Sequence, residues 1–239
     1  AAPGLDEDER QRLRKAIRGR HQVNVVFRNR RKNGEIFWND LTITPVADGT
    51  GKVTHFIGVL NDVTALKQRT AHLEHEVNHD ALTGLANRTL LWDRLEQAIH
   101  MAQRNKTLVA TALIDLNGFK QINDSYGHEA GDEVLKAVAQ RLSESVRDSD
   151  TVARLSGDEF VLVLVNQPSM RYTLRMIERL RTALAQPVTF DHTEIETGAS
   201  IGISMFPHDG ANALELVRAA DVAMYHAKAA RQDQAYFFS

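Results

Sequence analysis

Arg154-Leu155-Ser156-Gly157-Asp158-Glu159-Phe160 is the most informative stretch of this sequence. Thr151 to Ala153 precede it and the apolar run Val161 to Val165 follows it, so the pattern predicts a strand, a tight turn and a second strand. Ser-Gly-Asp is ordinary turn chemistry, and alone it favours a purely structural interpretation. Two adjacent carboxylates at a hairpin tip repel each other, however, and the small residues before them leave backbone N–H groups free to face a phosphate. A metal ion carrying a phosphate would use both features.

A second stretch supports the metal-site hypothesis. Leu108 to Ile114 form an apolar run of strand length that ends in Asp115. An acid at the exit of a buried strand lies where ligands bind in α/β sheets. If the hairpin lies beside this strand, Asp115 and Asp158 approach each other, and a hard divalent cation would satisfy both carboxylates. Because Mg²⁺ binds one or two carboxylates together with water and phosphate oxygens, the pattern indicates phosphoryl or nucleotidyl transfer.

Five motifs, in this order and spacing, resemble the GGDEF family of diguanylate cyclases, in a variant with Ser156 as its first residue. They are His79 to Arg88 (HDALTGLANR), Asp115 to Asp124 (DLNGFKQIND), Gly127 to Asp132 (GHEAGD), Ser156 to Phe160 (SGDEF) and Ala220 to Lys228 (ADVAMYHAK). The resemblance covers about residues 79–238. It implies a palm-like α/β fold, a mixed β-sheet flanked by helices. It also implies that two GTP molecules condense into cyclic di-GMP and pyrophosphate across a dimer of domains, as in bacterial biofilm signalling.

The resemblance implies roles for single residues of these motifs. Asp158 and Glu159 would be catalytic. The implied ligands of Mg²⁺ or Mn²⁺ are Asp115, the Leu116 carbonyl, Asp158 and Glu159. The implied contacts to the GTP substrate come from Lys120, Asn123, Asp132, Arg154, Ser156, Gly157 and Lys228.

Chemistry supports separate roles within the substrate-binding set. Asn123 and Asp132 would read guanine, because a carboxylate accepts from the N1–H and 2-amino donors that adenine does not offer. Ser156 and Gly157 would present backbone amides to phosphate, and the two lysines would neutralise triphosphate charge. Asp132 and the lysines also have structural interpretations, since an acid suits the first turn of a helix and a lysine suits its C-terminus.

A possible inhibitory site precedes the hairpin. Arg147-Asp148-Ser149-Asp150 matches the family's RxxD site, where the Arg147 guanidinium and the Asp150 carboxylate would bind the cyclic di-GMP product. The alternative is a surface ion pair, but the position just before the hairpin favours the inhibitory site. The sequence departs from the family in two places. Asn117 replaces a second aspartate, which reduces the local negative charge but leaves Asp115 intact. Arg231-Gln232-Asp233 replaces Gly-Arg-Asn, so the phosphate-binding arginine is displaced or lost, and a lower affinity for GTP is expected.

The N-terminal quarter predicts a helix followed by a partial antiparallel β-meander. Residues 6–20 are helical in pattern, with Asp6 and Glu9 spaced like a capping box. The strand-like runs are Val23 to Arg30, Glu35 to Val46 and Lys52 to Asn61, with turn signals at Asn33-Gly34 and Asp48 to Gly51. Together they resemble the second half of a PAS domain, particularly the LOV subgroup, over about residues 6–64.

This PAS-like part lacks the features of a photoreceptor. The flavin-capturing cysteine is missing, and Leu60 occupies the usual position of a glutamine, which argues against a flavin cofactor. Half a PAS domain cannot close its own core, so we expect dimer pairing, strand exchange or partial disorder. The basic run Arg28 to Lys32 is better explained as protection of a strand edge than as a surface for nucleic acid.

A helical linker is predicted between the two parts. Apolar or small residues recur in steps of three and four at Val63, Leu66, Thr70, Leu73 and Val77. This is a short heptad pattern suited to a parallel dimer. His72, His75 and His79 share roughly one face, but a polar helix surface explains them better than a metal site does.

Composition sets outer limits on function. The 239 residues contain 43% hydrophobic residues, no cysteine, and 29 Lys and Arg against 31 Asp and Glu. We therefore expect a packed core, no disulfides, and no general attraction to nucleic acid. No apolar run reaches the roughly 18 residues of a membrane span, and no secretory signal is visible, so we expect the cytoplasmic side of a bacterial cell. The sequence does not begin with Met, so we expect a piece of a longer protein whose membrane attachment stays open.

The predicted domains are a PAS/LOV-like part at 1–62, the linker at 63–78 and a GGDEF domain at 79–239. Within the last, we expect helices at Thr89 to Ala102, Gly131 to Val146, Met170 to Ala185 and Ala211 to Ala230. Besides the strands already given, we expect Pro187 to Phe190 and Glu194 to Met205. The leading hypothesis is a diguanylate cyclase with sensory input. The alternative is a weakly active, GTP-binding regulator of an adjoining EAL phosphodiesterase, since Ala235 to Ser239 resemble the join to such a domain.

Overall fold

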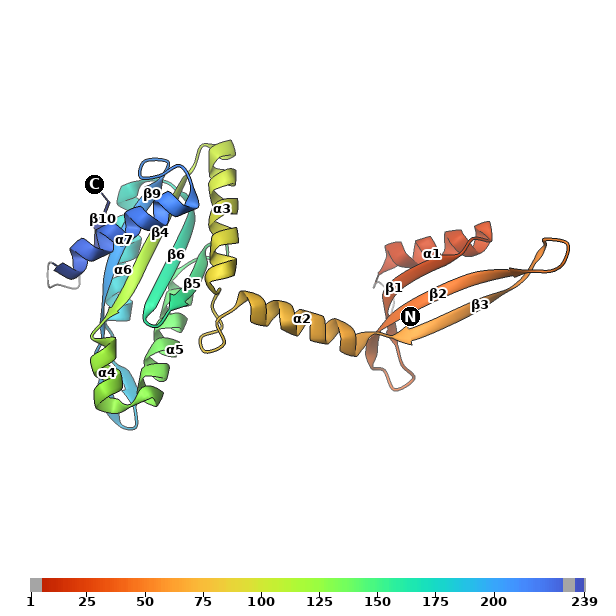
Figure 1. Ribbon diagram of the computed structural model, residues 1–239, viewed down its shortest axis with the longest axis horizontal. Helices are drawn as coiled ribbons and strands as arrows, with labels where there is room; N and C mark the ends of the chain where they lie inside the picture. The colour runs from red at the N-terminus through yellow and green to blue at the C-terminus, as the bar shows by residue number, and fades with distance from the viewer. Residues whose placement is uncertain (1–5, 230–234, 239) are drawn as a thin grey trace. The chain divides into compact units, whose positions relative to one another are not determined.

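The computed structural model describes residues 6–229 and 235–238, and the side chains of these apart from 71–75 (Figure 1). The chain divides into two compact units, Ala1–His75 and Glu76–Ser239. Helix α2, Thr64–Asn78, contains the boundary between them.

The first unit is a helix on a three-stranded antiparallel sheet, as the sequence predicts. Helix α1 spans Glu7–Gly19, and the strands β1 (Val23–Arg30), β2 (Ile36–Ala47) and β3 (Val53–Asp62) follow one another in the order β1-β2-β3. Val25, Phe27 and Leu41 form its small buried core. Leu13 of α1 packs against this core, so the helix covers one face of the sheet beside β1.

The predicted capping box of α1 is wrong. Asp6 has a left-handed backbone, φ +55°, and its side chain caps no helical N–H group. Its carboxylate instead accepts from the Arg28 backbone N–H at 2.7 Å and from the Arg28 guanidinium at 3.2 Å. The backbone hydrogen bond, above all, lowers the pKa of Asp6. Glu9 pairs with Arg12 at 2.6 Å. Asp6 therefore fastens the helix to β1, because a partner on a neighbouring strand competes successfully with the local cap.

The second unit is built on a five-stranded sheet in the order β10-β9-β4-β6-β5. Its strands are β4 (Leu108–Asn117), β5 (Thr151–Ser156), β6 (Glu159–Gln167), β9 (Gly198–Phe206) and β10 (Ala235–Phe237). Only β10 and β9 run parallel within this sheet, so it is mixed, as predicted. The central strand β4 is buried along almost its whole length, which accounts for the unbroken apolar run at Leu108 to Ile114.

Helices cover both faces of this sheet (Figure 1). On one side lie α3 (Arg88–Asn105) and α7 (Ala213–Ala229), packed on alternate residues of β4 and β6 such as Leu113 and Val161. On the other lie α5 (His128–Ser145) and α6 (Met170–Leu184), packed on the intervening residues such as Ile114 and Leu162. The predicted α/β architecture is confirmed.

Several boundaries differ from the prediction. Helix α4, Phe119–Tyr126, was not predicted, because its eight residues are too short to be stable by propensity and form a helix by packing on α5. Helix α5 begins three residues earlier than expected. The predicted strand at Glu194 to Met205 is divided into β8 (Thr193–Ile195), which pairs with β7 (Val188–Phe190), and β9.

The heptad pattern of the linker lies on an exposed helix. Leu66 and Val77 of α2 are 66% and 63% exposed, and the Leu73 side chain lies outside the described part of the chain. The same holds for the side chains of His72 and His75. Among the described residues, no helix is both long enough and apolar enough to cross a membrane.

Candidate nucleotide and metal site

The β5–β6 hairpin tip lies beside the end of β4. Strand β6 pairs with β4 so that Glu159 stands opposite Asp115. The Leu116 N–H donates to the Asp158 carbonyl oxygen at 3.2 Å. The structure therefore brings together, at one end of the sheet, the four residues that the sequence suggested as metal ligands: Asp115, Leu116, Asp158 and Glu159. We call this cluster the carboxylate corner.

Strand alternation decides what faces the corner. Side chains alternate along β4, so Asp115 lies on the same face as Val109 and Leu113. These two residues pack on the α3 and α7 side of the sheet. Lys228, in the last turn of α7, reaches Asp115 from that side, with its Nζ atom 2.8 Å from Oδ2. In this structure, the lysine predicted to neutralise a triphosphate neutralises an aspartate.

The surroundings of Asp158 in the carboxylate corner disfavour its ionised form. Burial and the nearby charge of Asp115 raise the pKa of Asp158, and Lys228 and Arg154 offset only part of that effect. A cation between the two carboxylates would favour the ionised form of Asp158. The Glu159 carboxylate is engaged locally, since its Oε2 accepts from the Ser156 hydroxyl at 3.2 Å.

The donor set suits a small hard cation that brings other ligands with it. Among the described residues, no group of three or more His, Cys, Asp or Glu side chains is placed to hold a metal ion by itself. Two repelling carboxylates beside a strand-end carbonyl match Mg²⁺ or Mn²⁺, which fill their remaining positions with water and phosphate oxygens. The raised pKa of Asp158 is the structural observation behind this fit.

Arg154 holds the turn of the hairpin. Its guanidinium donates to the Gly157 carbonyl oxygen at 2.8 Å from Nη2 and at 3.0 Å from Nε, and to Asp80 Oδ1 at 3.0 Å from Nη1. Gly157 has φ +51°, a conformation that favours glycine. The sequence suggested Arg154 as a substrate contact, and in the structure its donors serve the turn that carries Asp158.

Asp80 anchors this arginine from the segment before α3. Burial would raise the pKa of Asp80, but hydrogen bonds from Thr83 and Arg154 outweigh it and lower the pKa. The sequence analysis missed this role, although Asp80 lies in the HDALTGLANR motif that carried the resemblance. An acid 74 positions from its arginine gives no local signal of the pairing.

The suggested guanine readers lie on a second group of elements, α4 and α5. Asn123 is half-buried on α4, while Lys120 on α4 and Asp132 on α5 are exposed. Asp132 also lines a hollow of about 420 Å³ whose other wall is the β7–β8 hairpin. The structure thus separates the site residues into the carboxylate corner with Lys228, Ser156, Gly157 and Arg154, and a group on α4 and α5. Gly118 alone separates β4 from α4 along the chain.

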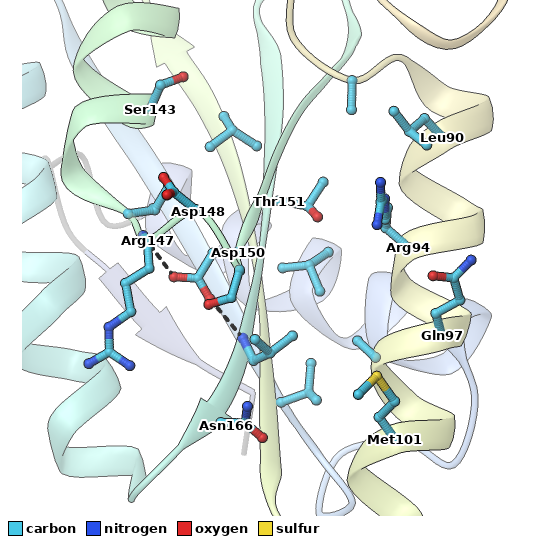
Figure 2. A pocket seen from close by; sticks show the side chains of 18 of the residues that line it. Leu90, Arg94, Gln97, Met101, Ser143, Arg147, Asp148, Asp150, Thr151 and Asn166 are labelled. Carbon is cyan, nitrogen blue, oxygen red and sulfur yellow. Dashed lines mark hydrogen bonds between the residues drawn. The ribbon is translucent and has the colours of Figure 1, made fainter. Parts of the chain in front are cut away.

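A cavity of about 570 Å³ lies between α3 and the loop before β5 (Figure 2). Arg94, Gln97 and Met101 of α3 line one wall, and the predicted inhibitory pair, Arg147 and Asp150, lines the other. In Figure 2 the Arg147 side chain points away from α3. Its guanidinium donates to the Tyr172 hydroxyl at 2.9 Å.

Asp150 is fully engaged by the backbone. Its Oδ2 accepts from the Arg147 N–H at 3.1 Å, and its Oδ1 accepts from the Val165 N–H at 3.0 Å (Figure 2). The structural role of this acid is therefore clear, whereas its inhibitory role stays a prediction.

The two departures from the family have different outcomes. Asn117 turns toward β9, because its Oδ1 accepts from the Ser200 hydroxyl at 2.8 Å. Arg231-Gln232-Asp233 lie outside the described residues. His79, from the predicted histidine face, lies with Nδ1 3.1 Å from the Gly84 carbonyl oxygen.

Comparison with known families gives two matches. The family described as "Diguanylate cyclase, GGDEF domain" matches residues 77–234, and the family described as "PAS domain" matches residues 5–65.

Individual relatives are similar in the same regions. The bifunctional diguanylate cyclase/cyclic di-GMP phosphodiesterase MucR of Pseudomonas aeruginosa is 46% identical over 166 residues, which is 69% of this chain and 24% of that protein. An uncharacterized signaling protein of Caulobacter vibrioides is 35% identical over 243 residues, 100% of this chain and 28% of that protein. The chain thus spans about a quarter of the length of these relatives. A solved structure of an N-terminally truncated mutant of PA1120 (TpbB or YfiN) from P. aeruginosa, which comprises only the GGDEF domain, is 36% identical, with a TM-score of 0.66. The match covers 67% of this chain and 94% of that one.

Proposed function

We propose that this chain, which belongs to the GGDEF family of diguanylate cyclases and carries a PAS domain before its GGDEF domain, condenses two GTP molecules into cyclic di-GMP and pyrophosphate. The observation that carries the proposal is the carboxylate corner. Asp158 lies there beside Asp115 with a raised pKa, at the tip of a hairpin that the fold holds in place. Such a corner has little structural use without a cation and its anionic substrate.

The corner residues would divide metal and substrate binding among them. Asp115, the Leu116 carbonyl, Asp158 and Glu159 would hold Mg²⁺ or Mn²⁺. When bound, this ion supplies Lewis-acid activation of a ribose 3′-hydroxyl and neutralises charge on the α-phosphate under attack. The backbone amides of Ser156 and Gly157 would donate to the phosphate oxygens, as their exposure at the turn permits.

The reaction needs one proton acceptor and one leaving group. The 3′-oxygen of one GTP forms a bond to the α-phosphorus of the other, and the bond from that phosphorus to pyrophosphate breaks. The Glu159 carboxylate accepts the proton of the 3′-hydroxyl. Lys120 and Lys228 balance the charge of the departing pyrophosphate, Lys228 after exchanging Asp115 for phosphate oxygens. Repetition with the roles of the two nucleotides exchanged closes the ring.

Guanine selectivity would come from the α4 and α5 group. The Asp132 carboxylate accepts from N1–H and the 2-amino group, and the Asn123 carboxamide contacts the same base. Adenine offers neither donor at these positions, so ATP is a poor substrate.

Dimerisation and sensory control belong to the same proposal. Each GGDEF domain holds one GTP, so condensation requires two domains with their sites facing each other. Helix α2 follows the PAS strand β3 almost directly and is the segment through which a sensory input would act. GTP as substrate places the domain on the cytoplasmic side of a bacterial cell, with any membrane attachment outside this stretch.

Product inhibition at the Arg147 and Asp150 loop is the regulatory part of the proposal. Arg147 would exchange the Tyr172 hydroxyl for a phosphate of cyclic di-GMP, a stronger partner for a guanidinium. The adjoining cavity of about 570 Å³ supports it with space for a base.

A second candidate is a weakly active domain that binds GTP and regulates an EAL phosphodiesterase in the same protein. Its support is the 46% identity to MucR, whose name joins a cyclase with a phosphodiesterase. The departure at Arg231-Gln232-Asp233 also favours it, because the phosphate-binding arginine of the family is displaced or lost there, which would lower the affinity for GTP and leave turnover inefficient.

The test is product analysis. The purified chain is incubated with GTP and Mg²⁺ at a concentration that permits dimerisation, and nucleotides are separated by chromatography beside an Asp158→Ala variant. We expect cyclic di-GMP and pyrophosphate from the parent and neither from the variant. GTP binding without product would favour the regulatory candidate, and no GTP binding would contradict both.

A further inference from the structure

Gly131, in the second turn of α5, leaves space that the Asn123 side chain occupies. A Cβ atom added at Gly131 would lie 2.0 Å from Asn123 Oδ1 and 3.0 Å from Asn123 Cγ. The first distance is far below any van der Waals contact, and the second is tighter than ordinary contact. Any side chain at position 131 would therefore force the Asn123 carboxamide out of its present position.

The surroundings leave Asn123 few ways to respond. Phe119 limits the same space, with its Cζ atom 3.3 Å from the position that a Cβ atom of residue 131 would take. The Asn123 backbone is fixed, because its carbonyl accepts from the Gly127 N–H at 3.0 Å and the next residue back, Ile122, is buried. Only the side-chain torsions of Asn123 can change, so the displaced group is the carboxamide.

The backbone at Gly131 gives no other reason for a glycine. Its φ is not among the positive values of the described chain, so alanine would fit the helical conformation. Glycine inside a helix costs about 1 kcal/mol relative to alanine. The fold therefore carries a destabilising residue at a buried position where its only distinct property is the absent side chain.

We propose that Gly131 is a positioning residue for guanine recognition: because it has no side chain, it leaves the space that the Asn123 carboxamide occupies against α5, one residue before Asp132. The inference rests on the proposed function, in which Asn123 and Asp132 read the base. It adds a reason why the Asn123 carboxamide, on α4, lies against α5, the helix that carries Asp132.

The first test is the Gly131→Ala variant of the full chain. We expect its preference for GTP over ATP to fall about tenfold, the effect of losing one well-placed hydrogen-bonding group, as measured by displacement of a fluorescent GTP analogue. We expect its melting temperature to stay or rise, because the crowded atoms belong to the end of a flexible side chain and alanine favours the helix. An unchanged nucleotide preference would overturn the inference.

A matched control separates positioning from crowding in general. Gly19→Ala also places a Cβ in tight contact with the end of a side chain, 2.8 Å from His21 Cδ2, but at the end of α1 in the first unit. We expect this variant to keep the parent's preference for GTP over ATP. The same loss of preference in both variants would contradict a specific role for Gly131.

The double variant Asn123→Ala/Gly131→Ala tests the mechanism itself. Once Asn123 is truncated, we expect the added Gly131→Ala change to weaken GTP binding no further, since effects through one shared contact are not additive. Additive losses would overturn the inference. If the single Gly131→Ala variant failed to fold, recovery of folding in the double variant would support the clash with Asn123, and failure of both would assign Gly131 to packing instead.

The parent protein distinguishes this inference from the proposed function. If the parent prefers GTP over ATP and the Gly131→Ala variant has the same preference, only the positioning role of Gly131 is refuted. A parent without any preference for GTP refutes guanine recognition and the inference with it.

Discussion

The two ends of the β5–β6 hairpin carry carboxylates in opposite situations. Asp150, just before β5, gives both oxygens to backbone N–H groups, those of Arg147 and Val165. Asp158, at the turn, lies beside Asp115, and burial together with that neighbour raises its pKa. The same residue type thus stabilises one end of the hairpin and destabilises the other.

The difference distinguishes a carboxylate that stabilises the fold from one that is suited to binding a cation. An acid whose two carboxylate oxygens accept hydrogen bonds from backbone N–H groups acts by stabilising the folded chain. An acid that the fold partly buries beside another acid lowers stability and is understandable only with a cation and a substrate present. Motif matching suggested both Asp150 and Asp158 as ligand-binding residues, and the hydrogen bonds of Asp150 distinguish it from Asp158.

The largest expected effect comes from Asp158→Asn, which removes the destabilising charge. Product formation should fall at least about a thousandfold, since a metal ligand that stabilises the transition state by several kcal/mol is lost. The metal-free variant should melt about 2 °C higher than the parent. Chromatography of cyclic di-GMP and thermal unfolding measure the two effects. Asp93→Asn, an exposed acid on α3, serves as the control, and activity in Asp158→Asn above a tenth of the parent's would contradict the assignment.

The opposite result is expected for Asp150→Ala. Losing the carboxylate leaves the Arg147 and Val165 N–H groups without their partner, at a cost of about 2 kcal/mol. Thermal unfolding should show a melting temperature lower by about 5 °C, while the initial rate of cyclic di-GMP formation per folded molecule, before product accumulates, stays near that of the parent. A stable but inactive variant would show that both ends of the hairpin serve the chemistry directly.

Arg154→Lys tests how the hairpin turn that carries Asp158 is held in place. A lysine cannot reproduce the two hydrogen bonds to the Gly157 carbonyl and the ion pair with Asp80 at once. We expect kcat to fall about tenfold with a smaller change in KM, because the turn that carries Asp158 becomes less well ordered. Steady-state kinetics measure the effect, with Arg104→Lys at an exposed position of α3 as the control. A change in KM alone would favour direct contact between Arg154 and substrate.

The smallest expected effect is on the pH dependence of stability without metal. Because the folded chain raises the pKa of Asp158, it binds more protons than the unfolded chain between the ordinary pKa of aspartate, about 4, and the raised value. Asp158 therefore lowers the free energy of unfolding as the pH rises through that window. The melting temperature of Asp158→Asn minus that of the parent should grow from near zero at about pH 4 to its full value at neutral pH. A difference that is constant with pH would contradict the raised pKa.

Much of the fold follows from local patterns. The meander of the first unit, the hairpin and the helices α3, α6 and α7 were predicted because their apolar periodicity and turn residues are strong. Helix α4 and strand β10 were missed because each is short and depends on packing or pairing with distant residues. The capping box failed because Asp6 found its partner on β1, 22 positions away, which no local pattern contains.

The site was predictable where strand register decides it. Asp115 and Asp158 come together because β4 and β6 pair, and two apolar runs with acids at their ends indicated that pairing. The roles of Lys228, Arg154 and Asp80 in the structure were not predictable, since each depends on a side chain crossing between elements far apart in sequence. The space that Gly131 leaves for the Asn123 side chain depends on the distance between α4 and α5. Composition and periodicity give no information on that distance.

The most direct measurement is the affinity of the carboxylate corner for a divalent ion in the presence of nucleotide. Mn²⁺ is titrated into the parent and into Asp158→Asn with α,β-methylene GTP, which cannot react, and free Mn²⁺ is followed by electron paramagnetic resonance. We predict nucleotide-dependent binding to the parent and at least about tenfold weaker binding to the variant. Equal affinities in the two proteins would contradict a metal site at Asp115 and Asp158.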